Sequence, residues 1–288
     1  MVASLNETHE HSSSIDTILF PFAEFGRSSE RYPCCPSMKP AIDEKPSTPT
    51  SESPQAGPER ERLLADRAAL HRHFGSERLV DKFLWSWFHP DTSYRVLDLS
   101  AGTGEIPCFI SKWCEERRIT VRIDAVESDP AKLEIARKQG KSHPNIDWIP
   151  VEPLAYESAL TYDLVHCSLA PQRLGAEDKV KLLKHCRELS HQFVIIADLE
   201  RNLSTDLSVW LMTSLLCREP GTRAYGKRCA RSACTWSELR ELAKAAGWEH
   251  FGHARFLLCS QAVWLFERDL GDIHQEAVEV PSVLPCPT

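Results

Sequence analysis

The order of apolar and polar positions divides most of the chain into alternating strands and helices. Apolar runs of strand length recur at 94–99, 121–127, 146–151, 162–168 and 193–198. Between them, apolar residues spaced three and four positions apart, as on one face of a helix, occur at 105–114, 130–139 and 176–189. This alternation predicts βαβ units, and therefore a parallel sheet with helices on both of its faces.

The start of the chain lacks the apolar residues that a core requires. Residues 1–57 are rich in Ser, Thr, Glu and Pro, so the little apolar surface they could bury does not offset the entropy lost on ordering. We predict that this extension is disordered, and we regard Met38 as an alternative start of the protein. Helical composition begins at 59–74, and residues 76–88 carry apolar side chains on one helix face.

The end of the chain departs from the βαβ pattern. Residues 207–217 form an apolar helical segment, which the pattern assigns either to the core or to one wall of an apolar pocket. A helix over 236–247 is expected to start at a capping box. The apolar stretches 249–258 and 261–268 are joined by a short link, so two further strands should pair antiparallel or lie as near neighbours.

Composition narrows the class of protein. The net charge is −7, with 42% hydrophobic and 26% charged residues, which is ordinary for a globular chain and gives no basic footprint for nucleic acid. The eleven cysteines include no C-x-x-C pair and no zinc-type spacing, which favours free thiols, a reducing compartment and no structural metal. No apolar run reaches the ~20 residues of a membrane span, and we expect a cytoplasmic protein.

The first strand leads into the clearest candidate for a binding site, RVLDLSAGTGEIP at 95–107. A glycine turn between a strand and a helix lets a ligand approach the backbone at the carboxyl end of a sheet. Dinucleotides place a pyrophosphate there, but the third glycine of their motif is replaced by Pro107, and Asp98 would repel the phosphates. A cationic ligand without phosphate, such as S-adenosylmethionine, fits this carboxylate better. Asp98 could instead cap the turn by accepting backbone N–H groups.

Two more carboxylates follow later strands. Glu127 ends the second strand, where it could accept hydrogen bonds from both hydroxyls of a ribose or could serve as an acid at a helix start. Asp129 and Pro130 are then expected to cap and begin the next helix. Glu152, after the third strand, is placed to reach an adenine edge. Three acids at successive strand ends predict one nucleoside site.

These motifs, VLDLSAGTGE, AVESDP, VEPLAY and YDLVHCSLA, resemble those of the class I S-adenosylmethionine-dependent methyltransferases. The resemblance implies a Rossmann-like, doubly wound, mostly parallel seven-stranded α/β sheet with an antiparallel C-terminal strand and helices on both faces. It assigns 58–270 to the methyltransferase domain, including N-terminal lid helices, and 271–288 to a tail. It implies S-adenosyl-L-methionine as cofactor, held by Asp98, Ser100, Ala101, Gly102, Thr103, Gly104, Glu127, Ser128, Glu152, Pro153 and Ser168.

Within this superfamily the chain most resembles the ubiquinone/menaquinone-type enzymes that methylate small molecules. DLERN at 198–202 and RSACTWSEL at 231–239 are similar to segments that recur in a subgroup associated with polyketides. An aromatic, quinone- or polyketide-like acceptor is therefore expected. The candidates for orienting it are Gln172, Arg173, Arg201 and Arg231.

The chain also departs from the family pattern. Ser100 stands where the family has its first glycine, Pro153 removes a backbone N–H often directed at adenine, and Gln172 and Arg173 replace a histidine pair. No general base is evident, and His166 and Cys167 are interpreted as packed core residues. The alternatives are an RNA or protein methyltransferase, an inactive methyltransferase fold that binds a partner, and, least favoured, a dinucleotide-dependent oxidoreductase.

Overall fold

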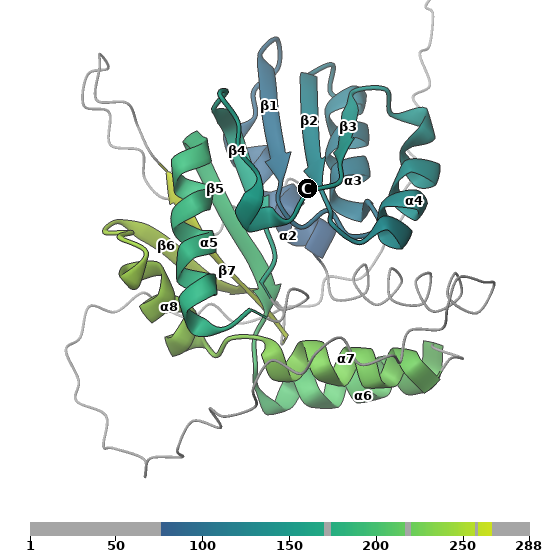
Figure 1. The fold of residues 1–288 in the computed structure, drawn as a ribbon, viewed down its shortest axis with the longest axis vertical. Helices are drawn as coiled ribbons and strands as arrows, with labels where there is room; N and C mark the ends of the chain where they lie inside the picture. The colour runs from purple at the N-terminus through teal and green to yellow at the C-terminus, as the bar shows by residue number, and fades with distance from the viewer. Residues whose placement is uncertain (1–75, 170–173, 217–219, 257–258, 267–288) are drawn as a thin grey trace, which may run out of the picture. The chain divides into compact units, whose positions relative to one another are not determined.

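The structure, a computed structural model, describes residues 76–169, 174–216, 220–256 and 259–266. The chain divides into two units, 1–50 and 51–288, and every described residue belongs to the second unit. These residues form a sheet of seven strands in the order β3-β2-β1-β4-β5-β7-β6 (Figure 1). The crossover between β3 and β4 places later strands on the other side of β1, as a doubly wound sheet requires.

The strands run parallel except at one end of the sheet. Their bounds are β1 Ser93–Asp98, β2 Thr120–Val126, β3 Ile146–Ile149, β4 Tyr162–Cys167, β5 Ser190–Leu199, β6 Phe251–Phe256 and β7 Ser260–Phe266. Strands β1 to β5 pair in parallel, whereas β7 pairs antiparallel with both β5 and β6. The prediction of a mostly parallel sheet with an antiparallel C-terminal strand is confirmed.

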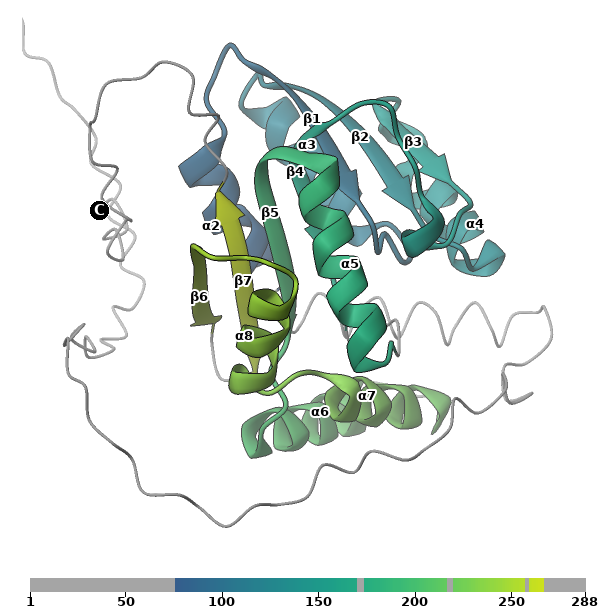
Figure 2. The ribbon, with the colours of Figure 1, turned by 60° about the vertical axis from the view of Figure 1, so that its left-hand side comes forward.

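Helices cover both faces of the sheet (Figures 1 and 2). Their bounds are α2 Ser76–Trp87, α3 Glu105–Glu116, α4 Pro130–Gln139, α5 Ala176–Leu189, α6 Leu203–Leu216, α7 Pro220–Ser232 and α8 Trp236–Ala245. Helices α2, α3 and α4 lie on one face, and α5 and α8 lie on the other. Helices α6 and α7 pack on one another beyond the carboxyl end of β5 (Figure 2).

Two hydrophobic clusters form the core, one on each face of the sheet. Successive residues of β1 contribute to opposite clusters: Val96 packs with α2 and α3, and Leu97 packs with α5 and α8. Both side chains are fully buried. Because a covered parallel sheet has no solvent face, its strands need apolar residues at consecutive positions. This is why the apolar runs in the sequence were continuous rather than alternating.

Most predicted elements are found with small changes at their ends. The predicted bounds of α4 and α5 are confirmed, and the capping box of Thr235 and Glu238 opens α8. The helical segment predicted from residue 207 starts earlier, at Leu203, and helix α7 was not predicted at all. The predicted helix at 59–74 lies outside the described residues. No helix in the described ranges has the length and apolar character that crossing a bilayer demands.

Candidate functional site

The turn that links β1 to α3 depends on two glycines in the left-handed backbone region. Gly102 has φ 58° and Gly104 has φ 97°. A Cβ atom on Gly104 would lie 2.8 Å from the ring of Trp148 and 3.2 Å from Ala136, so this glycine also lets the turn pack closely on β3 and α4. Thr103, inside the turn, donates a hydrogen bond to Glu105, which begins α3. The positive φ angles of the two glycines thus form the turn between strand and helix that the sequence predicted.

Asp98 ends β1 directly before this turn and is only 1% exposed. Its Oδ1 accepts the backbone N–H of Ser100 at 2.9 Å and faces the Ser100 hydroxyl at 3.4 Å. Its Oδ2 has no polar partner among the described residues. One oxygen therefore caps the turn while the other has no polar partner among the described residues, so the two interpretations of Asp98 are compatible.

His166 lies at the candidate site beside Asp98, a contact that the sequence did not predict. It lies in β4 opposite Asp98, and its Nδ1 is 3.2 Å from Asp98 Oδ1. Both side chains are buried, and within the described part of the chain Nδ1 finds no partner aligned for a hydrogen bond. The expectation of a packed histidine holds, but the imidazole packs against the carboxylate itself. Its Nδ1 therefore approaches the same carboxylate oxygen that caps the turn.

Ser100, the residue that replaces a family glycine, has a structural role. Its hydroxyl oxygen accepts the backbone N–H of Ser168 at 2.7 Å, which ties the loop after β1 to the loop after β4. The backbone N–H of Leu169 donates in turn to Asp198 Oδ2 at 3.0 Å, at the end of β5. The carboxyl ends of three neighbouring strands are held together through these bonds. The substitution therefore supports the loop rather than disturbing it.

Glu127 follows β2 and is nearly buried, but both of its oxygens have partners. Oε1 accepts the backbone N–H of Asp129 at 2.8 Å, and Oε2 lies 3.1 Å from the Lys132 ammonium. Asp129 caps α4 as expected, since its Oδ1 accepts from the backbone N–H of Ala131. Lys132 was not identified from the sequence, although its position five residues after Glu127 in the first turn of a helix made the contact possible.

Glu152 and Ser128 complete the row of strand ends. Glu152 is exposed after β3, and its carbonyl accepts from the backbone N–H of Ala155 in the short 3-10 helix that Pro153 begins. Ser128 is half-buried beside Glu127. Because β1, β2 and β3 are adjacent and parallel, the acids at 98, 127 and 152 all follow the same edge of the sheet. The sequence predicted this arrangement.

The four residues proposed to orient a substrate have mixed outcomes. Gln172 and Arg173 lie outside the described residues. The guanidinium of Arg201 donates to the carbonyls of Arg231 and Ala233 and pairs with Glu238 of α8. Arg231 is exposed near the end of α7. Arg201 is thus held mainly by its own neighbourhood, and a role in substrate binding remains a prediction for all four.

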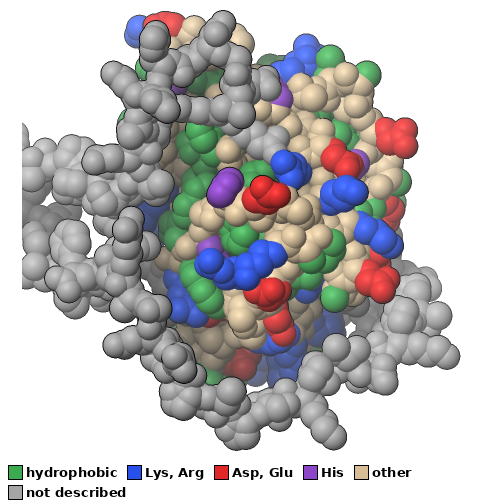
Figure 3. Space-filling view, turned by 90° about the vertical axis from the view of Figure 1, so that its left-hand side faces the viewer, with side chains coloured by type: hydrophobic (Ala, Val, Ile, Leu, Met, Phe, Trp, Pro, Cys, Tyr) green, Lys and Arg blue, Asp and Glu red, His purple; other side chains and the backbone are tan. Residues whose placement is uncertain are grey.

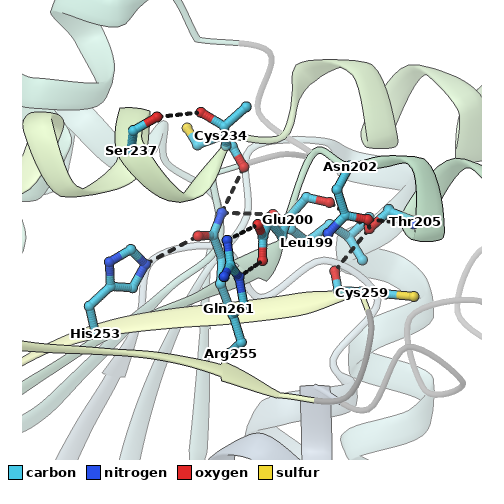
Figure 4. A network of polar contacts seen from close by, with 11 residues as sticks. Leu199, Glu200, Asn202, Thr205, Cys234, Ser237, His253, Arg255, Cys259 and Gln261 are labelled. Carbon is cyan, nitrogen blue, oxygen red and sulfur yellow. Dashed lines mark hydrogen bonds and ion pairs between the residues drawn. The ribbon is translucent and has the colours of Figure 1, made fainter. Parts of the chain in front are cut away.

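A second polar network lies where β5 meets β7 and β6 (Figure 4). Arg255 forms a bidentate ion pair with the buried Glu200, at 2.6 and 2.7 Å. The fully buried Gln261 donates to the carbonyls of Leu199 and Cys234, and its amide oxygen lies 3.1 Å from His253 Nε2. These bonds satisfy the polar groups at the end of β5 and fix the segment that leads to α6. Although the buried His253 Nδ1 has no hydrogen-bond partner among the described residues, the other contacts of the network are paired internally and support structure.

The buried thiol of Cys167 does not supply a nucleophile. Contact with Cys186, together with complete burial, raises the pKa of Cys167 well above its ordinary value. Cys167 therefore stays a neutral thiol, in agreement with its interpretation as a core residue. No group of three or more His, Cys, Asp or Glu side chains that could hold a metal occurs in the described ranges.

Comparison with known proteins finds similarity in structure alone. No family model matches the sequence, and no curated protein does. The plantazolicin methyltransferase BamL, in complex with a triazolic desmethylPZN analog and S-adenosylhomocysteine (SAH), superposes with a TM-score of 0.56 at 17% identity, over 73% of this chain and 91% of that one. BpumL, a plantazolicin methyltransferase in complex with SAH, gives 0.56 at 15% identity, over 74% and 92%.

At these identities the similarity establishes the fold. The chain has the class I methyltransferase fold, with the strand order and the antiparallel β7 that the resemblance implied. Its candidate site lies at the carboxyl ends of β1 to β4, where folds of this type bind their ligands.

Proposed function

We propose that this protein is an S-adenosylmethionine-dependent methyltransferase that acts on a small molecule. The observation that carries the proposal is the buried carboxylate of Asp98 beneath the glycine turn, with Oδ1 bonded to the turn and Oδ2 without a polar partner in the described ranges. A buried acceptor of this kind favours a cationic donor group from a ligand. Two neighbours of the same fold are complexes with SAH, the demethylated product of the proposed cofactor.

The residues of this chain fit that cofactor. Asp98 Oδ2 would accept from the ammonium of its methionine part, and Glu127 would accept from the ribose hydroxyls after Lys132 shifts. Ser128, Glu152 and Pro153 would border the adenine, which Pro153 cannot bind through a backbone N–H. Ser100, Ala101, Gly102, Thr103, Gly104 and Ser168 would form the loop surface. The bound cofactor supplies an electrophilic methyl group, and the protein supplies orientation and a dry environment.

For the acceptor we propose an aromatic, quinone- or polyketide-like small molecule. The net charge of −7 supports a small acceptor over nucleic acid, because nucleic-acid binding draws on a basic surface. On the face seen in Figure 3, basic and acidic side chains lie side by side. A phenol or an enolisable β-ketone needs little more than the loss of a proton to become the attacking phenolate or enolate, so the lack of an evident base among the described residues does not argue against this acceptor class. Gln172, Arg173, Arg201 and Arg231 remain the candidates for orienting the acceptor. The domain limits 58–270 and the cytoplasmic location remain predictions.

A second candidate function is a methyltransferase fold that binds a partner without catalysis. The ion pair between Glu127 and Lys132 favours it, because a ribose would have to compete with an ammonium that is already in place. A carboxylate oxygen can accept from more than one donor, so the pair weakens ribose binding without preventing it.

Calorimetry and an acceptor screen test both candidates. We expect S-adenosylmethionine and SAH to bind with dissociation constants on the order of 1 μM to 1 mM, as for ordinary enzyme ligands. Transfer of a labelled methyl group to one of a panel of phenols, hydroquinones and β-ketones would then identify the acceptor class. Absence of binding at millimolar cofactor would refute the proposal. Binding without transfer to any acceptor would favour the inactive fold.

A further inference from the structure

Helix α6 presents an apolar stripe to solvent. Its members recur at helical spacing and are strongly exposed: Leu203 87%, Leu207 63%, Trp210 63%, Leu211 42% and Leu215 70%. Large apolar side chains that are exposed singly are common, but a contiguous stripe of this kind marks a surface that binds something. The stripe runs along the helix from its first residue almost to its end.

The opposite face of α6 holds the helix in place. Thr205, Val209 and Thr213 are buried there. Thr205 donates to the carbonyl of Glu200, which anchors the start of the helix to the end of β5. Because the core needs only this second face, the exposed stripe is not required for packing among the described residues. The sequence also allowed this segment to form one wall of an internal pocket, but residues that line such a wall would be less exposed than those of the stripe.

The partner helix carries positive charge. Arg223, Lys227 and Arg231 recur every four residues on α7 and are exposed, so they form one basic row. The residues that α7 buries are small, namely Thr222, Gly226, Cys229 and Ala230. In the described parts of the two helices Asp206 is the only acidic residue, although the whole chain has a net charge of −7. The row and the stripe thus lie on two helices that pack against one another.

We propose that the α6–α7 hairpin binds the surface of an anionic lipid bilayer. Exposed leucines and a tryptophan that can enter the interface, in a hairpin that also carries a basic row, have the composition of interfacial amphipathic elements. A second copy of this chain fits less well, because a two-fold interface through α6 would bring two positively charged hairpins together. The hairpin follows β5 directly, so binding would place the carboxyl edge of the sheet near the lipid, where an apolar acceptor would dissolve.

Vesicle sedimentation with the full chain tests this surface. We expect the protein to bind phosphatidylcholine vesicles that contain phosphatidylglycerol, and to bind pure phosphatidylcholine and high-salt samples much more weakly. Replacing Arg223 and Lys227 by Gln should weaken binding about fivefold per charge, or roughly 25-fold in the double variant. Leu207→Glu should weaken it at least about tenfold. Arg231 is left unchanged because it is a candidate for substrate binding.

Matched variants elsewhere control for nonspecific effects. Lys138→Gln with Lys181→Gln removes two exposed charges from α4 and α5, and Leu160→Glu replaces an exposed leucine outside the hairpin. Both should bind vesicles as the parent does, and thermal unfolding confirms that every variant folds. Equal binding to neutral and anionic vesicles, or no loss in the hairpin variants, would overturn the proposal.

Light scattering on the same samples distinguishes the other possible occupants of the stripe. A parent dimer that Leu207→Glu converts to a monomer, together with no vesicle binding, would identify a self-interface instead. A monomeric full chain that does not bind vesicles would mean that another part of the chain covers the stripe. Either result would also overturn the proposal. Cofactor binding, measured by calorimetry, should be unaffected by the hairpin variants, so failure here is distinct from failure of the proposed function.

Discussion

Replacement of Asp98 by asparagine separates the two roles of this side chain. The amide oxygen of the substituted side chain can still accept the backbone N–H of Ser100, which in the parent lies 2.9 Å from Oδ1. The amide nitrogen would then stand where Oδ2 has no polar partner in the described ranges. The substitution removes the negative charge and turns an acceptor into a donor, while it preserves the shape of the turn.

The expected loss in cofactor affinity follows from the interaction that is removed. A hydrogen bond to a charged group contributes about 1.5–3 kcal/mol, which corresponds to roughly a 10- to 150-fold increase in Kd. Coulomb attraction between unit charges about 4 Å apart, at an effective dielectric constant of about 20, sets an upper limit near 4 kcal/mol. The expected loss therefore lies in the hydrogen-bond range and below this limit.

Calorimetric titration with two ligands measures this loss. SAH keeps the ammonium of S-adenosylmethionine but lacks the positive charge on sulfur. An equal loss for both ligands would mean that Asp98 binds the shared ammonium, and a loss confined to S-adenosylmethionine would indicate the sulfonium. Urea unfolding serves as the control, because the retained bond to Ser100 should keep the free energy of unfolding within about 1 kcal/mol of the parent.

An unchanged affinity would refute the reasoning. If Asp98→Asn bound both ligands within twofold of the parent and unfolded at the same urea concentration, Asp98 would only cap the turn. The inference that its buried charge selects a cationic ligand would then be wrong, whatever the fold.

Three further predictions concern the packing and protonation of the domain. Gly104→Ala should lower the free energy of unfolding by about 2–5 kcal/mol, because the new Cβ meets the Trp148 ring and the residue has a left-handed backbone conformation. Adding Trp148→Leu to this variant should restore only the part of the stability that is lost through the steric clash. A Gly104→Ala protein as stable as the parent in urea would contradict this prediction. Burial lowers the pKa of His253, so the folded state binds fewer protons than the unfolded state. Its contribution to stability should be complete above pH 6.5 and decline as the pH falls, and thermal melts of His253→Gln, which can still reach Gln261, should show a shallower decline. Burial and then the charge of Glu105 raise the pKa of Cys108 to about 11, so only about one thiol in a thousand is ionised at pH 8 and iodoacetamide should label it far more slowly in the folded than in the urea-unfolded protein, as mass spectrometry can measure.

Local signals in the sequence predicted most of the elements and the backbone of the site. Strand-length apolar runs and helical spacing placed β1 to β5 and the helices between them, because both faces of a parallel sheet are buried. Asp129 with Pro130 and Thr235 with Glu238 predicted helix starts, since capping is a contact between near neighbours. Helix α7 was missed because its glycines and basic residues show no apolar period, and its packing against α6 compensates for weak helix propensity.

Contacts between distant segments were decided by the tertiary structure alone. The sequence placed Asp98 at a strand end but could not pair it with His166, because that contact depends on the register between β1 and β4, which are separated by two other strands along the chain. Ser100 was seen only as a departure from a glycine until the fold brought Ser168 to its hydroxyl. The periodicity of apolar residues indicates which face of a helix or strand is buried, but it does not indicate which residue of another element lies opposite. The contact between Asp98 and His166 and the exposure of the α6 stripe are therefore properties of the folded chain.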